Sequence, residues 1–473
     1  MSTLLPGSGS PAEDSSEPTY DLGEVIPPVP ETIEEAGLSE STVEQLLLKI
    51  LFFRNEIIAS ELAAAAGFKF SVVDALIEGL KYKRLVHVKR SLGMGDASGV
   101  LALSEAGRNL AFSFLETNQY TGPAPVPLFQ YSILVRKQRR EAGWLSQDAL
   151  AYAYRKMVVT PEILAHIGPA VSSGNSFLIY GRPGNGKTYV AEALVNLDYA
   201  PIFIPYAIEC QGQIVQVFDP MYHQPIDDDE ASSVFDCEPS WDKRFAKCRR
   251  PFIVTGGELT LEMLDLTYNA TSKVYDAPFQ VKANNGIYLI DDFGRQKATP
   301  AEVLNRWIVP MERRVDFLSF RSGGKMTVPF EAFLIFSTNL RPRQLGDEAF
   351  LRRIQYKMLM PNPSAEEFAE IFRQFCRSRE LTFAEPLLER FIDQHYRRTG
   401  RPLRRCHPRD VLSHAIDLID FELLPQELTD ELLDRAFESC FMQKTDEPPN
   451  RRSSKVRTRS ADRTGRSRRP RNA

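Results

Sequence analysis

Residues 181–188 read Gly181-Arg182-Pro183-Gly184-Asn185-Gly186-Lys187-Thr188 and match the pattern Gly-x-x-x-x-Gly-Lys-Ser/Thr. The apolar run 177–180 before them predicts a buried strand, and residues 189–197 after them predict a helix. Glycines let successive backbone N–H groups turn toward a polyphosphate, and a helix N-terminus favours negative charge. The alternative is a glycine-rich turn that matches the pattern by chance. The strand before it and the helix after it argue against this alternative, because a chance match would not be expected to have both. The stretch therefore predicts a phosphate-binding loop.

The side chains of the loop have separate predicted roles. Lys187 is expected to bridge the β- and γ-phosphates of ATP, and the hydroxyl of Thr188 is expected to bind Mg²⁺. The predicted nucleotide contacts in this stretch are Gly181, Pro183, Gly184, Asn185, Gly186, Lys187, Thr188 and Tyr189. ATP and Mg²⁺ are the predicted cofactors.

A second chemical signal follows the apolar run 287–290, which ends in Asp291 and Asp292. Asp291 is expected to hold Mg²⁺, directly or through water, and Asp292 to orient or deprotonate the attacking water. The alternative is a strand that leaves the core into a polar turn. The position of the pair about a hundred residues after a phosphate-binding loop favours the catalytic interpretation.

Between residues 160 and 360, short apolar runs alternate with helical stretches. Continuous apolar strands between helices are typical of a parallel sheet that is covered on both faces, so an α/β fold is predicted. After Pro363 the pattern becomes purely helical. The predicted strands are 177–180, 202–204, 252–255, 287–290, 333–336 and 354–358.

Residues 160–445 resemble an AAA+ ATPase. The resemblance rests on the loop GRPGNGKT, the segment IDDFGR, the strand FLIFSTN and the helical region that follows. The resemblance implies a P-loop parallel sheet with a helical lid, and it makes Asn339 the polar sensor at the end of its strand. That family usually carries Asp-Glu where this chain has Asp291-Asp292. Aspartate is one methylene shorter, so the departure affects the base role of Asp292 more than the metal role of Asp291.

The same resemblance implies two arginine roles. The stretch DEAFLRRI at 347–354 is similar to the segment that supplies an arginine finger to the neighbouring subunit's γ-phosphate, which makes Arg353 the preferred finger and Arg352 its alternative. A basic surface turn is the competing interpretation. Arg409, at a predicted helix start, corresponds to the second sensor, with Arg404 and Arg405 as competitors.

A hairpin is predicted at 315–320 and 326–330, directly before the sensor strand. It resembles the AAA+ branch that includes MoxR chaperones, magnesium chelatase, MCM helicases and sigma-54 activators. The GAFTGA loop of sigma-54 activators is absent from 261–275, which argues against that activity. Residues 266–269 are equally compatible with a substrate-facing pore loop and an ordinary loop.

The remaining parts of the chain differ in composition. Residues 1–37 carry a charge of −8 and many prolines, and 451–473 carry +9, so both ends are predicted to be disordered tails. Three helices and a hairpin within 38–117 resemble a winged-helix module. The predicted domains are 1–37 acidic tail, 38–117 winged-helix-like, 118–159 linker, 160–360 nucleotide-binding, 361–445 helical lid and 446–473 basic tail.

A winged helix usually reads DNA with the start of its third helix, but residues 71–74 offer no basic side chain there. Lys81, Lys83, Arg84 and the pair 89–90 lie nearer the wing, where they could touch phosphates. Partner docking or oligomerisation is as well supported as DNA binding. The arginine-rich tail lacks aromatic residues, so it predicts at most non-specific nucleic-acid contact.

Composition restricts the function further. The chain has 473 residues, 43% of them apolar, which is enough for a sizeable core. Its six cysteines never form a C-x-x-C pair, and no signal peptide or membrane span is evident, so we expect a cytoplasmic protein without membrane contact. The hypothesis is an ATP-hydrolysing remodelling motor that forms a homo-oligomeric ring, perhaps a hexamer, and acts on protein or nucleic acid. The alternative is a nucleotide-gated binding switch with slow hydrolysis.

Overall fold

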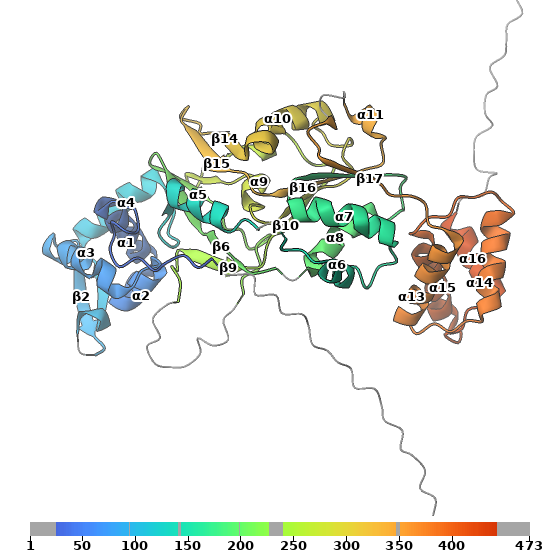
Figure 1. The fold of residues 1–473 in the computed structure, drawn as a ribbon. Helices are drawn as coiled ribbons and strands as arrows, with labels where there is room; N and C mark the ends of the chain where they lie inside the picture. The colour runs from blue at the N-terminus through green and yellow to red at the C-terminus, as the bar shows by residue number, and fades with distance from the viewer. Residues whose placement is uncertain are drawn as a thin grey trace, which may run out of the picture. The chain divides into compact units, whose positions relative to one another are not determined.

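The structure is a computed structural model that describes residues 25–93, 95–140, 143–197, 199–226, 240–346 and 351–441. It divides into two compact units, the first formed by residues up to 371 and by 402–406, the second by 372–401 and the residues from 407 onward (Figure 1). Most of the predicted acidic tail and the whole predicted basic tail lie outside the described residues. No described helix is long and apolar enough to cross a bilayer.

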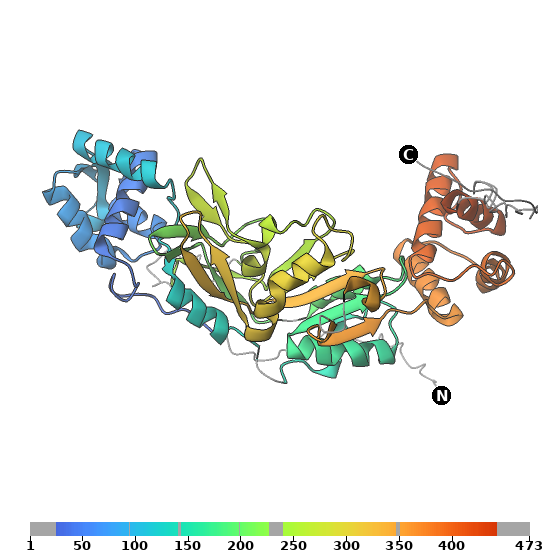
Figure 2. The same ribbon diagram turned by 90° about the horizontal axis from the view of Figure 1, so that it is seen from above.

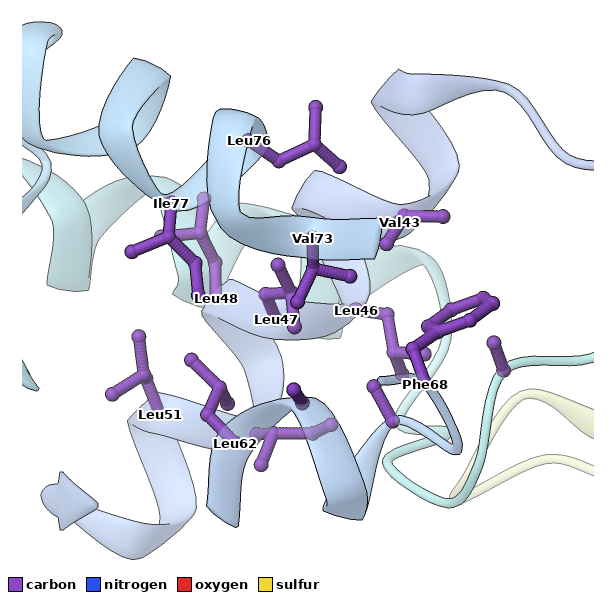
Figure 3. Packing of buried hydrophobic residues seen from close by; sticks show 14 of the residues in the cluster. Val43, Leu46, Leu47, Leu48, Leu51, Leu62, Phe68, Val73, Leu76 and Ile77 are labelled. Atoms are coloured by element: carbon purple, nitrogen blue, oxygen red, sulfur yellow. The ribbon is translucent and has the colours of Figure 1, made fainter. Parts of the chain in front are cut away.

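The N-terminal module consists of four helices and a small antiparallel sheet in the order β1-β3-β2. The side chain of Ser39 caps the first helix, and that of Ser104 caps the fourth. Apolar side chains from the first three helices meet in one core (Figure 3). The elements are α1 (Glu40–Arg54), β1 (Glu56–Ile58), α2 (Ala59–Ala65), α3 (Phe70–Tyr82), β2 (Val86–Ser91), β3 (Gly99–Leu103) and α4 (Glu105–Thr117).

Two ranges that the sequence assigned to a tail and a linker are packed where the structure describes them. Ile33 and Ala36 belong to the core of the N-terminal module. The buried guanidinium of Arg244, which is paired with Asp242, donates a hydrogen bond to the Ala36 carbonyl oxygen at 2.8 Å. Within 118–159 the chain forms β4 (Val126–Pro127), α5 (Leu128–Lys137) and α6 (Gln147–Ala153), and α5 buries Tyr131.

A five-stranded sheet with all strands parallel forms the centre of the first unit, in the order β10-β13-β16-β5-β17. Five of the six predicted strands belong to it. The prediction was wrong for 202–204, because this run pairs antiparallel with β9 in a separate ribbon, and an apolar run does not specify its partner strand. The strands are β5 (Ser176–Tyr180), β6 (Ile202–Pro205), β9 (Phe245–Cys248), β10 (Phe252–Thr255), β13 (Ile287–Ile290), β16 (Phe333–Thr338) and β17 (Tyr356–Leu359).

Helices cover both faces of the central sheet (Figures 1 and 2). Alternate residues of β5 point in opposite directions, since Phe177 and Ile179 pack with α6, α7 (Pro161–Ser173) and α8 (Lys187–Glu192), whereas Leu178 packs on the side of α10 (Pro300–Arg313). Burial on both faces explains why these strands read as continuous apolar runs.

The predicted hairpin before β16 is present as β14 (Val315–Ser319) and β15 (Lys325–Pro329), paired antiparallel. A second five-stranded sheet in the order β11-β12-β8-β7-β4 was not predicted, because its strands are too short to give a clear alternation. The additional elements of this region are β7 (Ala207–Cys210), β8 (Gln213–Gln216), β11 (Thr267–Asn269), β12 (Val274–Asp276), α9 (Phe279–Lys282) and α11 (Pro342–Leu345).

The C-terminal region is helical, as predicted. Within the second unit, Phe391 and Tyr396 pack against Phe437, which joins the helices around an aromatic core. The helices are α13 (Ala365–Ser378), α14 (Glu385–Ile392) followed by a π-helical turn, α15 (His407–Glu422) and α16 (Asp430–Cys440).

Candidate nucleotide-binding site

The glycine-rich loop connects the carboxyl end of β5 to α8, as the sequence predicts. Gly184 has φ 77°, and a Cβ there would lie 2.6 Å from the Cys406 Sγ. Gly181 has φ 154°, and a Cβ there would lie 2.5 Å from the Met360 carbonyl oxygen. Both positions therefore require glycine, because the chain passes close to its neighbours in a conformation that side chains disfavour.

The two predicted metal ligands are in direct contact. The Thr188 hydroxyl lies 3.0 and 2.9 Å from the two carboxylate oxygens of Asp291. A hydroxyl and a carboxylate are oxygen donors of the kind that Mg²⁺ prefers, together with phosphate oxygens and water. The donor set of this end of the site fits Mg²⁺.

A second chain of contacts joins the loop to the predicted sensor, Asn339, and to the second carboxylate, Asp292. The Lys187 ammonium donates to the Asn339 Oδ1 at 2.7 Å, and the Asn339 Nδ2 donates to the Asp292 Oδ1 at 2.8 Å. Lys187 and Asn339 are 152 residues apart in the sequence. Together with Asp292 they form one hydrogen-bonded line at the carboxyl edge of the sheet. The structure brings together five predicted residues: Lys187, Thr188, Asp291, Asp292 and Asn339.

The backbone fixes the two carboxylates. The Asp291 N–H donates to the Thr255 carbonyl oxygen at 2.8 Å, which continues the pairing of β13 with β10. Asp292 has φ 47°, a left-handed conformation that aspartate tolerates better than most residues. Because the chain turns at this point, the side chain of Asp292 reaches Asn339 on the neighbouring strand end. Strained backbone of this kind is common at functional sites.

The charge balance suits an anionic ligand. Burial lowers the pKa of Lys187 from its usual value, and the carboxylates of Asp291 and Asp292 act against this shift. The positive charges of Arg404 and Arg295 lower the same pKa further. These cations repel one another around the loop. A polyphosphate bound among them would stabilise their charged forms.

The arginines expected near the phosphates differ in position. Arg409 belongs to the second unit, where its exposed side chain pairs with the neighbouring Asp410. Arg404 belongs to the first unit, its Cβ is 3.7 Å from the position of a Cβ on Gly184, and it donates to the Asn362 Oδ1 at 2.6 Å. Arg405 is buried and pairs with Glu367. Within the first unit, Arg404 lies beside the loop.

The predicted finger, Arg353, lies in a turn before β17. The Arg353 Nε donates to Glu312 on α10 at 2.8 Å, and the arginine side chain is 30% exposed. Arg352 is more exposed. The first four residues of the finger segment, 347–350, lie outside the described residues.

Sequence reasoning missed three groups that support the site, namely the side chains of Gln296 and Asn362 and the backbone N–H of Cys406. The Gln296 side chain donates to the Asp291 carbonyl oxygen at 2.8 Å, and the buried Asn185 donates to Asn362 at 3.0 Å. The Cys406 N–H donates to the Gly184 carbonyl oxygen at 2.9 Å. Asn362 and Cys406 lie more than 170 residues from the loop, so no local pattern indicates them.

Comparisons with known proteins give distant relationships. A family model described as "Domain of unknown function (DUF8689)" matches residues 364–439, and no curated protein matches. A solved structure of NtrX from Brucella abortus is similar to 62% of this chain at 14% identity and a TM-score of 0.38. Two variants of RuvB from Thermotoga maritima are similar to 64% of it, at 11% and 13% identity and TM-scores of 0.33 and 0.32. The chain spans 58% of the length of that NtrX chain and 73% of each RuvB chain.

Proposed function

We propose that this chain is an AAA+ ATPase that hydrolyses ATP and works as a ring-forming remodelling motor. The observation that carries the proposal is the contact of Thr188 with Asp291 beside the line Lys187–Asn339–Asp292. These groups supply phosphate binding, metal binding, a sensor and a carboxylate base within one edge of a parallel sheet. The strand order supports the proposal, because β5, which precedes the loop, lies next to β16, which precedes Asn339.

Each residue of the site has a separate role in ATP hydrolysis. Bound Mg²⁺ would neutralise charge on the β- and γ-phosphates, held by Thr188 and Asp291. Lys187 binds the same phosphates, and its present partner Asn339 is then free to orient the attacking water. Asp292 accepts the proton of that water as the oxygen attacks the γ-phosphorus and the bond to the β-phosphate oxygen breaks.

We assign Arg404 a cationic contact beside the loop. The charge of Arg404 lowers the pKa of Lys187, which indicates that both cations lie near the same part of the loop. Asn362, which also binds Asn185, holds its guanidinium. We therefore assign the second sensor role to Arg404 in preference to Arg409.

Arg353 is proposed to complete the site of a neighbouring copy. If it acts between subunits, Arg353→Ala mixed with Asp292→Ala should recover ATP turnover above either protein alone, because a mixed ring contains sites with both groups intact. Arg352→Ala in place of Arg353→Ala is the matched control and should itself remain active. Phosphate release measured across mixing ratios tests this; no recovery at any ratio would count against a shared site.

The N-terminal module is proposed to dock a protein partner. Three of its cations are already paired, in the ion pairs Lys81–Glu78, Lys83–Glu44 and Lys89–Glu56. Paired side chains have less charge to offer to DNA phosphates, and α3 itself carries Glu78. The motor is therefore expected to act on a protein client.

This assignment predicts how the chain binds nucleic acid. Fluorescence anisotropy at about 50 mM salt should detect at most weak, sequence-independent binding, and deletion of 451–473 should abolish it, since each phosphate contact releases counterions. Arg90→Ala in the module should leave the affinity unchanged. Binding that survives the deletion and weakens in Arg90→Ala would favour a nucleic-acid client.

A further inference from the structure

A pocket lies at the amino ends of the central strands, opposite the ends that carry the phosphate-binding loop. Gly286 and Phe333, at the amino ends of β13 and β16, line it, whereas Asp291 and Asn339 follow the carboxyl ends of the same strands. It has about 370 Å³ of empty space, part of it open to solvent. Three of its lining residues are arginines: Arg139, Arg140 and Arg250.

Arg250 is fixed in the pocket wall by neutral partners. Its two terminal nitrogens donate to the carbonyl oxygens of Asn285 at 2.7 Å and Gln138 at 3.1 Å. Its Nε is buried, and no hydrogen-bond acceptor for it lies among the described residues. A buried guanidinium that binds only carbonyl oxygens keeps a positive charge without a counter-charge, which is costly unless an anion binds there.

Arg140 is oriented by aromatic rings. Its guanidinium carbon lies 4.5 Å from the ring centre of Trp144 and 4.3 Å from that of Tyr199. Stacking covers the faces of a guanidinium and leaves the N–H groups at its edge free to bind oxygen. The guanidinium is therefore held in one plane before any ligand arrives.

The charges of the pocket do not balance among the residues that line it. Glu331 is the only carboxylate lining the pocket in the part of the chain that is described, and its distance to the Arg139 Nε is 3.7 Å. Burial raises the pKa of Glu331, and burial together with the nearby charge of Arg140 lowers the pKa of Arg250. The effect of Arg140 on Arg250 reflects the closeness of the two cations, whereas the raised pKa of Glu331 follows from its burial, against the lowering effect of Arg139.

We propose that this pocket binds a phosphate group. Three guanidiniums line it from two segments of the chain, residues 139–140 and residue 250, and a tetrahedral dianion offers enough oxygens to accept from all of them. A single carboxylate would satisfy fewer of these donors. The ligand is either free phosphate or the phosphate of a small phosphomonoester, which carry the same chemistry. The site is separate from the ATP site and does not depend on its activity.

Isothermal titration calorimetry on the full chain tests the proposal. The titration uses Lys187→Ala protein to silence the phosphate-binding loop, with inorganic phosphate in one arm and glycerol 3-phosphate in the other. At least one probe should bind, and Arg250→Gln should weaken its binding about tenfold or more, as expected for a lost charged hydrogen bond. Tighter binding of one probe identifies the source of the phosphate.

Arg249→Gln is the matched control, because it removes the same charge from the adjacent, exposed residue and should leave the affinity unchanged. Arg140→Gln is the second test variant. It should weaken binding similarly and keeps the Arg250 contacts to Asn285 and Gln138, so it remains informative if Arg250→Gln does not fold. Failure of both probes to bind, or equal affinities in Arg140→Gln and the Lys187→Ala parent, would overturn the proposal.

Discussion

Lys187→Ala is expected to lower the rate of ATP hydrolysis by about a hundredfold or more, since it removes a preorganised cation from the developing charge on the phosphates. The ammonium is buried and is held by Asn339 at 2.7 Å, so no other side chain can take its place without rearrangement. Steady-state phosphate release with saturating ATP and Mg²⁺ measures the effect.

Lys156→Ala is the matched control for this variant. Lys156 is an exposed lysine outside the loop, and its replacement should leave turnover unchanged. Turnover of Lys187→Ala within twofold of the wild-type rate, with the control equally active, would show that the glycine-rich loop does not bind the reacting phosphates.

Asp292→Asn is expected to lower the catalytic rate by about a hundredfold or more while ATP binding is retained, because an amide cannot accept the proton of the attacking water. Among the described residues, the hydrogen bonds that link Asp292 to Lys187 run through Asn339. The affinity for ATP should therefore be retained in Asp292→Asn while the rate of ATP hydrolysis falls. Equilibrium binding of a fluorescent ATP analogue, measured beside phosphate release, tests both parts of the prediction.

Asp292→Glu distinguishes a base from a structural role at this position. It restores the carboxylate with one more methylene and should keep far more activity than Asp292→Asn if proton transfer is the lost step. Equal loss in both variants would indicate that Asp292 mainly orients Asn339. Asp292→Asn that turns over at the wild-type rate would remove the carboxylate from the mechanism.

The central sheet and much of the site could be predicted from sequence because the signals are local. A continuous apolar run such as 287–290 gives a strand that is buried on both faces, and Asp291 and Asp292 follow it directly. Parallel strands bring their carboxyl ends to one edge, so Asn339 meets the same site. Local pattern predicts the strand and the two carboxylates, whereas the role of Asn339 was predicted from the resemblance to AAA+ ATPases.

Other features depend on contacts between distant segments. The run 202–204 has the composition of a core strand, but its partner is β9, and composition does not select a partner. Residues 25–37 look like a tail, but Ile33 and Ala36 are buried because the N-terminal module and Arg244 provide a surface for them. Arg404 has no motif of its own, and only the approach of Cys406 to Gly184 brings it to the loop. Such positions require the tertiary structure.

The most direct test of the account is the number of ADP molecules that each wild-type chain produces from ATP and Mg²⁺ over time. If the chain is a motor, ADP accumulates through many turnovers per chain, and Asp292→Asn stops it while ATP stays bound. If the chain is a nucleotide-gated switch, ATP binds tightly and ADP does not exceed one molecule per chain. We expect the first result, and the second would contradict the assignment of this chain as a motor.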